Sequence, residues 1–191
     1  MVWSEVLYGV LFEPRATLRS LSIERPVIPA IVTFLAVAIF NLTVYRGIIL
    51  KQSYAINDLE QFLWLYQIMG AVFSFFMLFV MAGLFSLLSE LIFNKPNASG
   101  LLVCLGFSSL PGILGPALYY SAQIIDIQWL GVLCSLVIGV WMLVLQVLSL
   151  AEALELSTGQ AVALFVLPGV FAAIALVLVI AIFALFGQGI I

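Results

Sequence analysis

The chain has 191 residues, of which only 8 % are charged and 65 % are hydrophobic, and its formal net charge at pH 7 is −3. An average soluble domain has about 25 % charged and about 45–50 % apolar residues, so this chain cannot cover a water-exposed surface with polar groups. The composition therefore indicates an integral membrane protein and excludes a cytosolic enzyme. The acidic balance offers no basic patch, which also excludes a nucleic-acid partner.

Five apolar segments each reach the roughly 20 residues that a helix needs to cross about 30 Å of hydrocarbon. The apolar runs are continuous rather than alternating, which predicts helices and not the strands of a barrel. The predicted fold is an all-α integral membrane protein, with a bundle of five transmembrane helices (26–191) after a short cytoplasmic amphipathic segment (1–25). The expected spans are 26–50, 62–93, 100–124, 127–151 and 160–186.

Residues 1–25 form the sizeable segment before the first span. Apolar pairs recur there at helical spacing until Pro14 breaks the run. Trp3, Arg15 and Arg19 suit a short helix in the plane of the lipid headgroups, so we interpret these three residues as membrane-interface anchors. A helix packed against the cytoplasmic face of the bundle explains the same pattern equally well.

Lysine and arginine residues in short loops predict the orientation, because cytoplasmic loops carry an excess of them. With a cytoplasmic N-terminus, more of these cations lie inside than outside. The inside set is Arg15, Arg19, Arg25 and Lys95, and the outside set is Arg46 and Lys51. We therefore expect the N-terminus in the cytoplasm and the C-terminus outside.

Proline and glycine interrupt two of the expected spans. The third span contains Pro111-Gly112 followed by Gly115-Pro116, and the fifth contains Pro168-Gly169. A proline inside a helix removes a hydrogen bond, so both helices should kink or open. The kinks could shape the bundle, or they could frame a pathway for a substrate, as interrupted helices do in transporters. Each motif follows a leucine in the second helix of a hairpin, which also fits a two-hairpin internal repeat.

The fourth span carries Gly131, Ser135 and Gly139 at four-residue spacing. Small residues on one helix face allow another backbone to approach closely, which serves either packing within the bundle or self-association. Among the polar side chains expected inside the membrane, we single out Asn41 and Gln146 for a role beyond interhelical hydrogen bonds.

No set of residues for catalysis is recognisable. The sequence has no histidine to act as a general base or a metal ligand, and its two aspartates, Asp58 and Asp126, fall in outer loops. Glu152 and Glu155 lie at the cytoplasmic edge, where they are solvated charges at a helix end. We expect no enzymatic activity, no cofactor and no bound metal.

The layout resembles the Yip family, the Ypt/Rab-interacting membrane proteins with five spans. The resemblance rests on a proline-basic element at 11–18, a Ser-Ser-Leu-Pro turn at 108–111, Trp141 in the fourth span, and the segment 156–161 before the fifth. Eukaryotic members of the family carry a long cytosolic region and act in vesicle traffic with Rab GTPases. This chain has only about 25 residues before its first span. It therefore resembles the short prokaryotic branch in the plasma (inner) membrane, and the Rab partner is not carried over.

Two functions remain open from the sequence. The first is a non-enzymatic protein that organises the membrane or partner proteins, in contact with the lipid bilayer and with a membrane-protein partner or a second copy of itself. The alternative is a small transporter or channel for a lipid or small solute, which would pass through the kinked third and fifth helices.

Overall fold

The computed structural model describes residues 3–52 and 59–187, and it describes side chains over 5–49 and 62–179. All regular elements in the described part of the chain are helical, and no strand occurs there. The elements are α1 (Trp3–Phe12), α2 (Pro14–Glu24), α3 (Val27–Gln52), α4 (Leu59–Phe93), α5 (Ala98–Ser108), the 3₁₀ helix η1 (Leu110–Ile113), α6 (Leu114–Ile124), α7 (Gln128–Ala153) and α8 (Thr158–Gly187).

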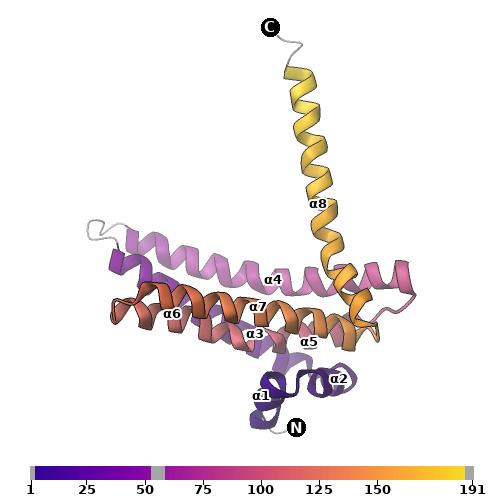
Figure 1. Cartoon of the computed structure of the whole chain (residues 1–191), viewed down its shortest axis with the longest axis horizontal. Helices are drawn as coiled ribbons and strands as arrows, with labels where there is room; N and C mark the ends of the chain where they lie inside the picture. Colours follow the sequence, from indigo (N-terminus) through magenta and orange to yellow (C-terminus); the bar gives the residue numbers. More distant parts are fainter. Residues whose placement is uncertain (1–2, 53–58, 188–191) are drawn as a thin grey trace.

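Within these residues, five helical segments are long and apolar enough to cross a membrane, so the prediction of an all-α membrane protein is confirmed. Their bounds are Val27–Ile49, Phe62–Phe93, Ala98–Ile124, Gln128–Ala153 and Thr158–Val179. The third of these is not one continuous α-helix, because it consists of α5, η1 and α6 in series. Helices α3, α4 and α7 and the α5–η1–α6 segment lie side by side, whereas α8 leaves this group at one end and runs transverse to it (Figure 1).

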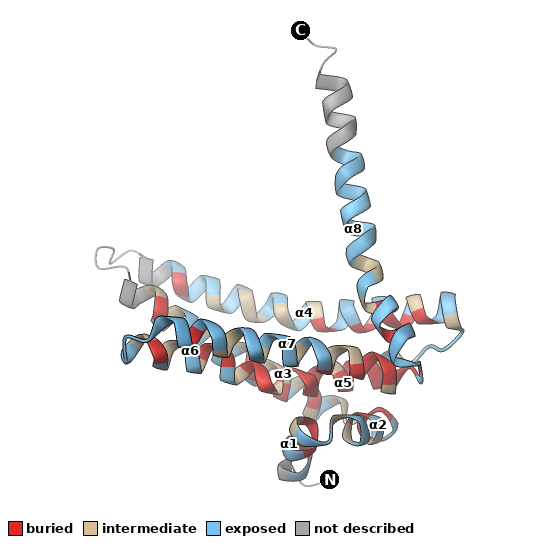
Figure 2. Ribbon diagram, viewed as in Figure 1, coloured by how far each residue is buried: buried red, intermediate tan, exposed pale blue. Residues whose placement is uncertain are grey.

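The interrupted third span is the most enclosed part of the bundle. Of its most apolar window, 61 % is buried, against 11 % for the first span and 6 % for the fifth. Figure 2 shows the buried positions gathered along α5, while α8 is exposed from Gly169 to Val179. A side chain at Gly106 has no room here, because its Cβ would lie 2.9 Å from the carbonyl oxygen of Ala30 on α3. The absence of a side chain therefore allows α3 and α5 to cross in close contact.

The N-terminal helices pack against the bundle at the end where α5 begins and α7 ends. Apolar side chains from seven helices form one buried cluster there, which includes Val10, Leu18, Leu21, Ala30, Phe85, Leu101, Cys104, Leu145, Leu150 and Leu164. The thiol of Cys104 donates a hydrogen bond to the carbonyl oxygen of Leu18, with 3.2 Å between sulfur and oxygen. In the structure, α1 and α2 are thus packed against the bundle.

The sequence-predicted anchors of this segment have different surroundings. Arg15 donates a hydrogen bond of 3.1 Å to the hydroxyl of Thr158 at the start of α8. Arg19 is exposed, and the side chain of Trp3 lies outside the described residues. Pro14 occupies the first position of α2, where its missing N–H costs nothing, so it divides the segment into two helices.

The small-residue face of α7 lies against α6 of the same chain. A Cβ at Gly131 would lie 2.8 Å from the Cβ of Ala122 and 3.1 Å from the Cα of Tyr119, and these are atoms that cannot rotate away. Ser135 donates a hydrogen bond of 3.2 Å to the carbonyl oxygen of Gly115. Gly139 has no atom within 4 Å of its would-be Cβ. Two members of this face thus hold α6 and α7 together, and the third leaves a gap.

This difference predicts opposite effects for one substitution at two sites on α7. Gly131→Ala should destabilise the protein by about 1–3 kcal/mol, because the added methyl group overpacks the contact with α6. Gly139→Ala should leave stability unchanged or raise it by about 0.5–1 kcal/mol, since the methyl group enters open space and alanine favours a helix. Unfolding by SDS in bicelles, followed by tryptophan fluorescence, measures both, and equal stabilities of the two variants would contradict this packing of α6 on α7.

Candidate functional site: cavities along the kinked third span

Two prolines determine where the third span is interrupted. α5 ends at Ser108, and η1 follows with Pro111 near its start. Local hydrogen bonds replace those of the α-helix: the N–H of Gly112 donates to the carbonyl oxygen of Ser109 at 2.9 Å, and the hydroxyl of Ser109 donates to the carbonyl oxygen of Gly106 at 2.7 Å. Pro116 has no N–H for the carbonyl four residues earlier, that of Gly112. The span therefore stays buried and mostly hydrogen-bonded while its backbone opens.

A polar cavity of about 210 Å³ lies beside this interruption. It lies between α3, η1, α6 and α7 and is open on one side, and three of its side chains carry hydrogen-bonding groups: Asn41, Tyr45 and Ser135. Glycine and proline make up much of the remaining wall, so backbone comes close to the cavity. The lining residues are Asn41, Tyr45, Gly112, Gly115, Pro116, Ser135, Ile138, Gly139 and Met142.

Asn41 is the polar residue of this cavity whose hydrogen bonding is incomplete. Its side-chain oxygen is buried and accepts no hydrogen bond from the described residues. Its amide nitrogen lies 3.7 Å from the position that a Cβ of Gly112 would take. An unpaired carbonyl group inside a membrane is costly, which makes this oxygen an acceptor for a water molecule or a small polar solute.

A second, apolar cavity of about 410 Å³ lies between the third and fifth spans and reaches α3, α4 and α7. Its wall is rich in methionine and phenylalanine, and the rings of Phe85 and Phe165 stack at one side with 6.1 Å between their centroids. The polar side chains in the wall are those of Ser109 and Gln146. The lining residues are Phe34, Met77, Leu78, Met81, Phe85, Leu105, Ser109, Met142, Gln146, Phe165, Pro168 and Gly169.

The proline–glycine kinks predicted for the third and fifth spans line two different cavities in the structure. Gly112, Gly115 and Pro116 line the polar cavity together with Ser135 and Gly139, and Pro111 is buried in η1 just before them. The kink residues of the fifth span line the apolar cavity instead. Asn41 and Gln146, the polar residues singled out from the sequence, lie one in each cavity.

Met142 contributes to both walls and is the side chain that the two cavities share. The sequence does not single out this residue, nor Met77 and Met81. A methionine in an apolar helix carries no signal that distinguishes a cavity wall from a packed core, since its flexible side chain serves in both.

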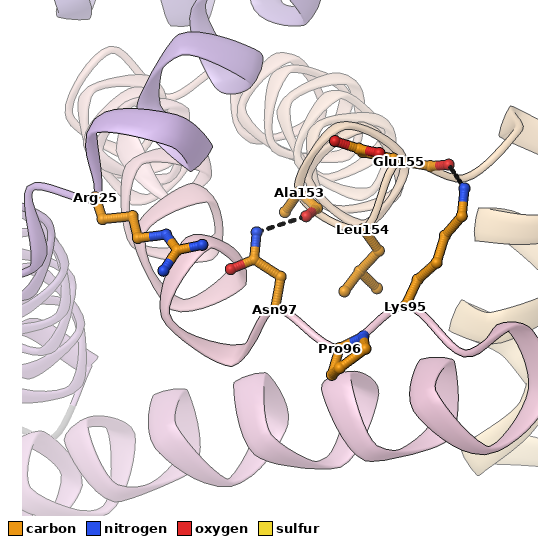
Figure 3. A pocket seen from close by; sticks show the side chains of 7 residues that line it. All are labelled: Arg25, Lys95, Pro96, Asn97, Ala153, Leu154 and Glu155. Carbon is orange, nitrogen blue, oxygen red and sulfur yellow. Dashed lines mark hydrogen bonds between the residues drawn. The ribbon is translucent and has the colours of Figure 1, made fainter.

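A third cavity, of about 270 Å³, lies where the α4–α5 loop meets the end of α7 (Figure 3). Lys95 donates a hydrogen bond of 2.6 Å to the carbonyl oxygen of Glu155, and the amide of Asn97 donates one of 2.8 Å to the carbonyl oxygen of Ala153. The side-chain oxygen of Asn97 accepts a hydrogen bond from the N–H of Gly100 at 3.2 Å, and so caps α5. These contacts satisfy carbonyl groups that the end of α7 leaves without partners, so the loop joins the two hairpins.

These features define the class of the protein, a polytopic α-helical membrane protein whose third span is interrupted beside cavities. The family model described as the Yip1 domain matches residues 8–182, and the chain belongs to this family of membrane proteins. Comparison with curated proteins gives no match, and neither does comparison with solved structures. The resemblance noted in the sequence is thereby confirmed.

We expect Asn97 to be the residue of this loop that stabilises the contact between the two hairpins. Asn97→Ala removes both the cap of α5 and the hydrogen bond to Ala153, so we expect a loss of about 1–2 kcal/mol of stability. Ser99→Ala is the matched control, because Ser99 lies two residues away in the first turn of the same helix. SDS unfolding of both variants measures the difference, and a Ser99→Ala protein as unstable as Asn97→Ala would contradict the assigned role.

Proposed function

We propose that this chain is a non-enzymatic membrane protein that organises the membrane by associating with other protein molecules inside the bilayer, and that its partner is a second copy of the chain. The observation that supports the proposal is the course of α8. Its first turns pack on the bundle through Ala161 and Leu164, but every residue from Gly169 to Val179 is exposed. Figure 1 shows the later turns of this helix extending away from α3–α7.

The composition of α8 limits where it can lie. From Ala161 to Gly187 it has no polar side chain, so it has no polar face to rest on a membrane surface. Beside a single bundle, α8 runs transverse to the other four spans (Figure 1), whereas a C-terminus on the opposite side of the membrane from the end of α7 requires α8 to cross the bilayer with them. A contact from outside the chain is therefore what sets the direction of α8 beside its own bundle.

A second copy is the partner that fits this helix best. Gly169, Ala173 and Val177 share one exposed face at four-residue spacing, and no atom lies within 4 Å of a Cβ built on Gly169. Small residues on one face allow two membrane helices to pack closely. The apolar part of α8 carries no charged or hydrogen-bonding group that would select a different protein, whereas a two-fold axis matches this face to itself.

The same proposal includes the location and orientation of the chain. We place it in a prokaryotic plasma membrane with its N-terminus in the cytoplasm and its C-terminus outside. This placement is supported by the four cations of the N-terminal segment and the α4–α5 loop, which carry the excess of positive charge expected of a cytoplasmic side.

Cysteine cross-linking tests the pairing of α8. In a background with Cys104→Ser and Cys134→Ala, Val177→Cys should form a disulfide-linked dimer on mild oxidation in native membranes. Val137→Cys on α7 is the matched control, because Val137 is also exposed, at 59 % against 65 % for Val177. Adding Ala173→Leu should lower the dimer yield several-fold by keeping the helices apart. A Val177→Cys chain that stays monomeric, or that cross-links no better than Val137→Cys, would refute the proposal.

A second candidate function is the passage of a small uncharged solute, and the polar cavity is the observation that favours it. Its wall has no ionisable group other than the phenol of Tyr45, but it offers the unpaired oxygen of Asn41 and the hydroxyl of Ser135. Interrupted helices form such sites in known transporter folds.

Glycerol uptake into vesicles that contain the purified chain tests this second function. The rate should exceed that of protein-free vesicles, and Gly139→Leu should reduce it several-fold, because the leucine fills the polar cavity without meeting an atom within 4 Å of its Cβ. Gly83→Leu on α4 is the control, since a Cβ there also meets open space but Gly83 does not line the cavity. Equal rates with and without protein would exclude passage of this solute.

A further inference from the structure

The carboxamide of Gln146 is a polar group with no partner in the wall of an apolar cavity. Gln146 lies on α7 and lines the cavity between the third and fifth spans. Within the part of the chain that the structure describes, no side chain or backbone group forms a hydrogen bond with this carboxamide. It lies seven positions before the end of α7 at Ala153, a rise of about 10 Å along a helix, so it lies at the depth of the lipid tails.

A carboxamide at this depth needs a hydrogen-bonding partner, because hydrocarbon offers none. The neighbouring polar group in the wall, the hydroxyl of Ser109, already donates to the carbonyl oxygen of Gly106. Unlike a carboxylate or an ammonium group, the amide both donates and accepts hydrogen bonds and carries no charge. The missing partner is therefore a group that also donates and accepts, such as a hydroxyl.

The remainder of the wall selects the body of such a ligand. No ionisable side chain lines the cavity, so a charged ligand would lack a counter-ion there. Met77, Met81 and Met142 supply flexible thioether side chains that adapt to an apolar chain of variable shape. At this depth, the bilayer itself is the source of apolar molecules.

We propose that this cavity binds the hydrocarbon chain of an uncharged single-chain amphiphile, such as a long-chain alcohol, with its hydroxyl group held by the carboxamide of Gln146. This binding site goes beyond the proposed function, and it shares one residue, Gly169, with the face of α8 that is proposed to pair. Pro168 and Gly169 form one side of the cavity, so the bend of the fifth span is part of the site.

Photolabelling of the purified full chain in lipid nanodiscs tests the proposal. The probe is 1-hexadecanol with a diazirine at the far end of its chain, and mass spectrometry locates the labelled residues. Labelling should concentrate on Met77, Met81 and Met142, and excess unlabelled hexadecanol should suppress it. Hexadecane and hexadecanoate at neutral pH should compete at least several-fold less well. If hexadecane competes equally, or if the label spreads evenly over the lipid-facing sides of α4 and α7, the proposal is wrong.

Two variants test the hydrogen bond to Gln146 and the volume of the cavity separately. Gln146→Leu removes the hydrogen-bonding group, and it should weaken competition by hexadecanol several-fold and bring it close to that of hexadecane. Gln123→Leu on α6 is the matched control, because it makes the same change outside the cavity and should have no effect. Gly169→Leu should reduce labelling by filling the cavity, since a Cβ there has open space.

The failure of this site can be told apart from that of the proposed dimer. The Val177→Cys cross-link is measured in the same preparations as the labelling. Labelling that Gln146→Leu and Gly169→Leu both leave unchanged would overturn the binding site whether or not the cross-link forms.

Discussion

Inside a bilayer, backbone groups that lose their helical hydrogen bonds must find partners in the protein, because lipid tails offer none. The third span is where this chain meets that constraint, since Pro111 and Pro116 interrupt its hydrogen bonding near the middle of the span. The hydroxyl of Ser109 and short-range backbone bonds take over there. The neighbouring helices enclose the interruption, and Gly106 lets α3 approach within contact of the backbone. The arrangement of the other helices around α5 and α6 follows from this need.

The interruption of the third span also leaves unfilled volume between the helices. Glycine and proline have too little side chain to fill the volume between α3, α6 and α7, so a polar cavity remains beside η1. A second cavity forms where the fifth span bends away from the bundle, and Met142 lies between the two. With so few charges in the chain, both cavities rely on uncharged groups, the carboxamides of Asn41 and Gln146. Neither cavity therefore offers a charged side chain to a bound molecule.

Hydropathy predicts the spans well, because a membrane helix must be apolar over its whole length. Proline positions likewise predict where the third span opens, since the effect of a missing N–H is local. The cavities could not be predicted, because they depend on which helices lie next to each other and on Met142, whose type is common in packed cores. The direction of α8 away from the other helices could not be predicted either. Its sequence is apolar on every face, so nothing in it distinguishes a helix beside its own bundle from one that extends away.

The interruption of the third span should create a polar space within the membrane. Spin labels at Gly139→Cys and Gly83→Cys, in the chain without its native cysteines, test it in lipid vesicles. Both glycines lie several turns from the ends of their helices, but only Gly139 lines the polar cavity. We expect a water-soluble nickel chelate to relax the label at position 139 much more strongly than the label at position 83. Equal and weak relaxation at both positions would contradict it.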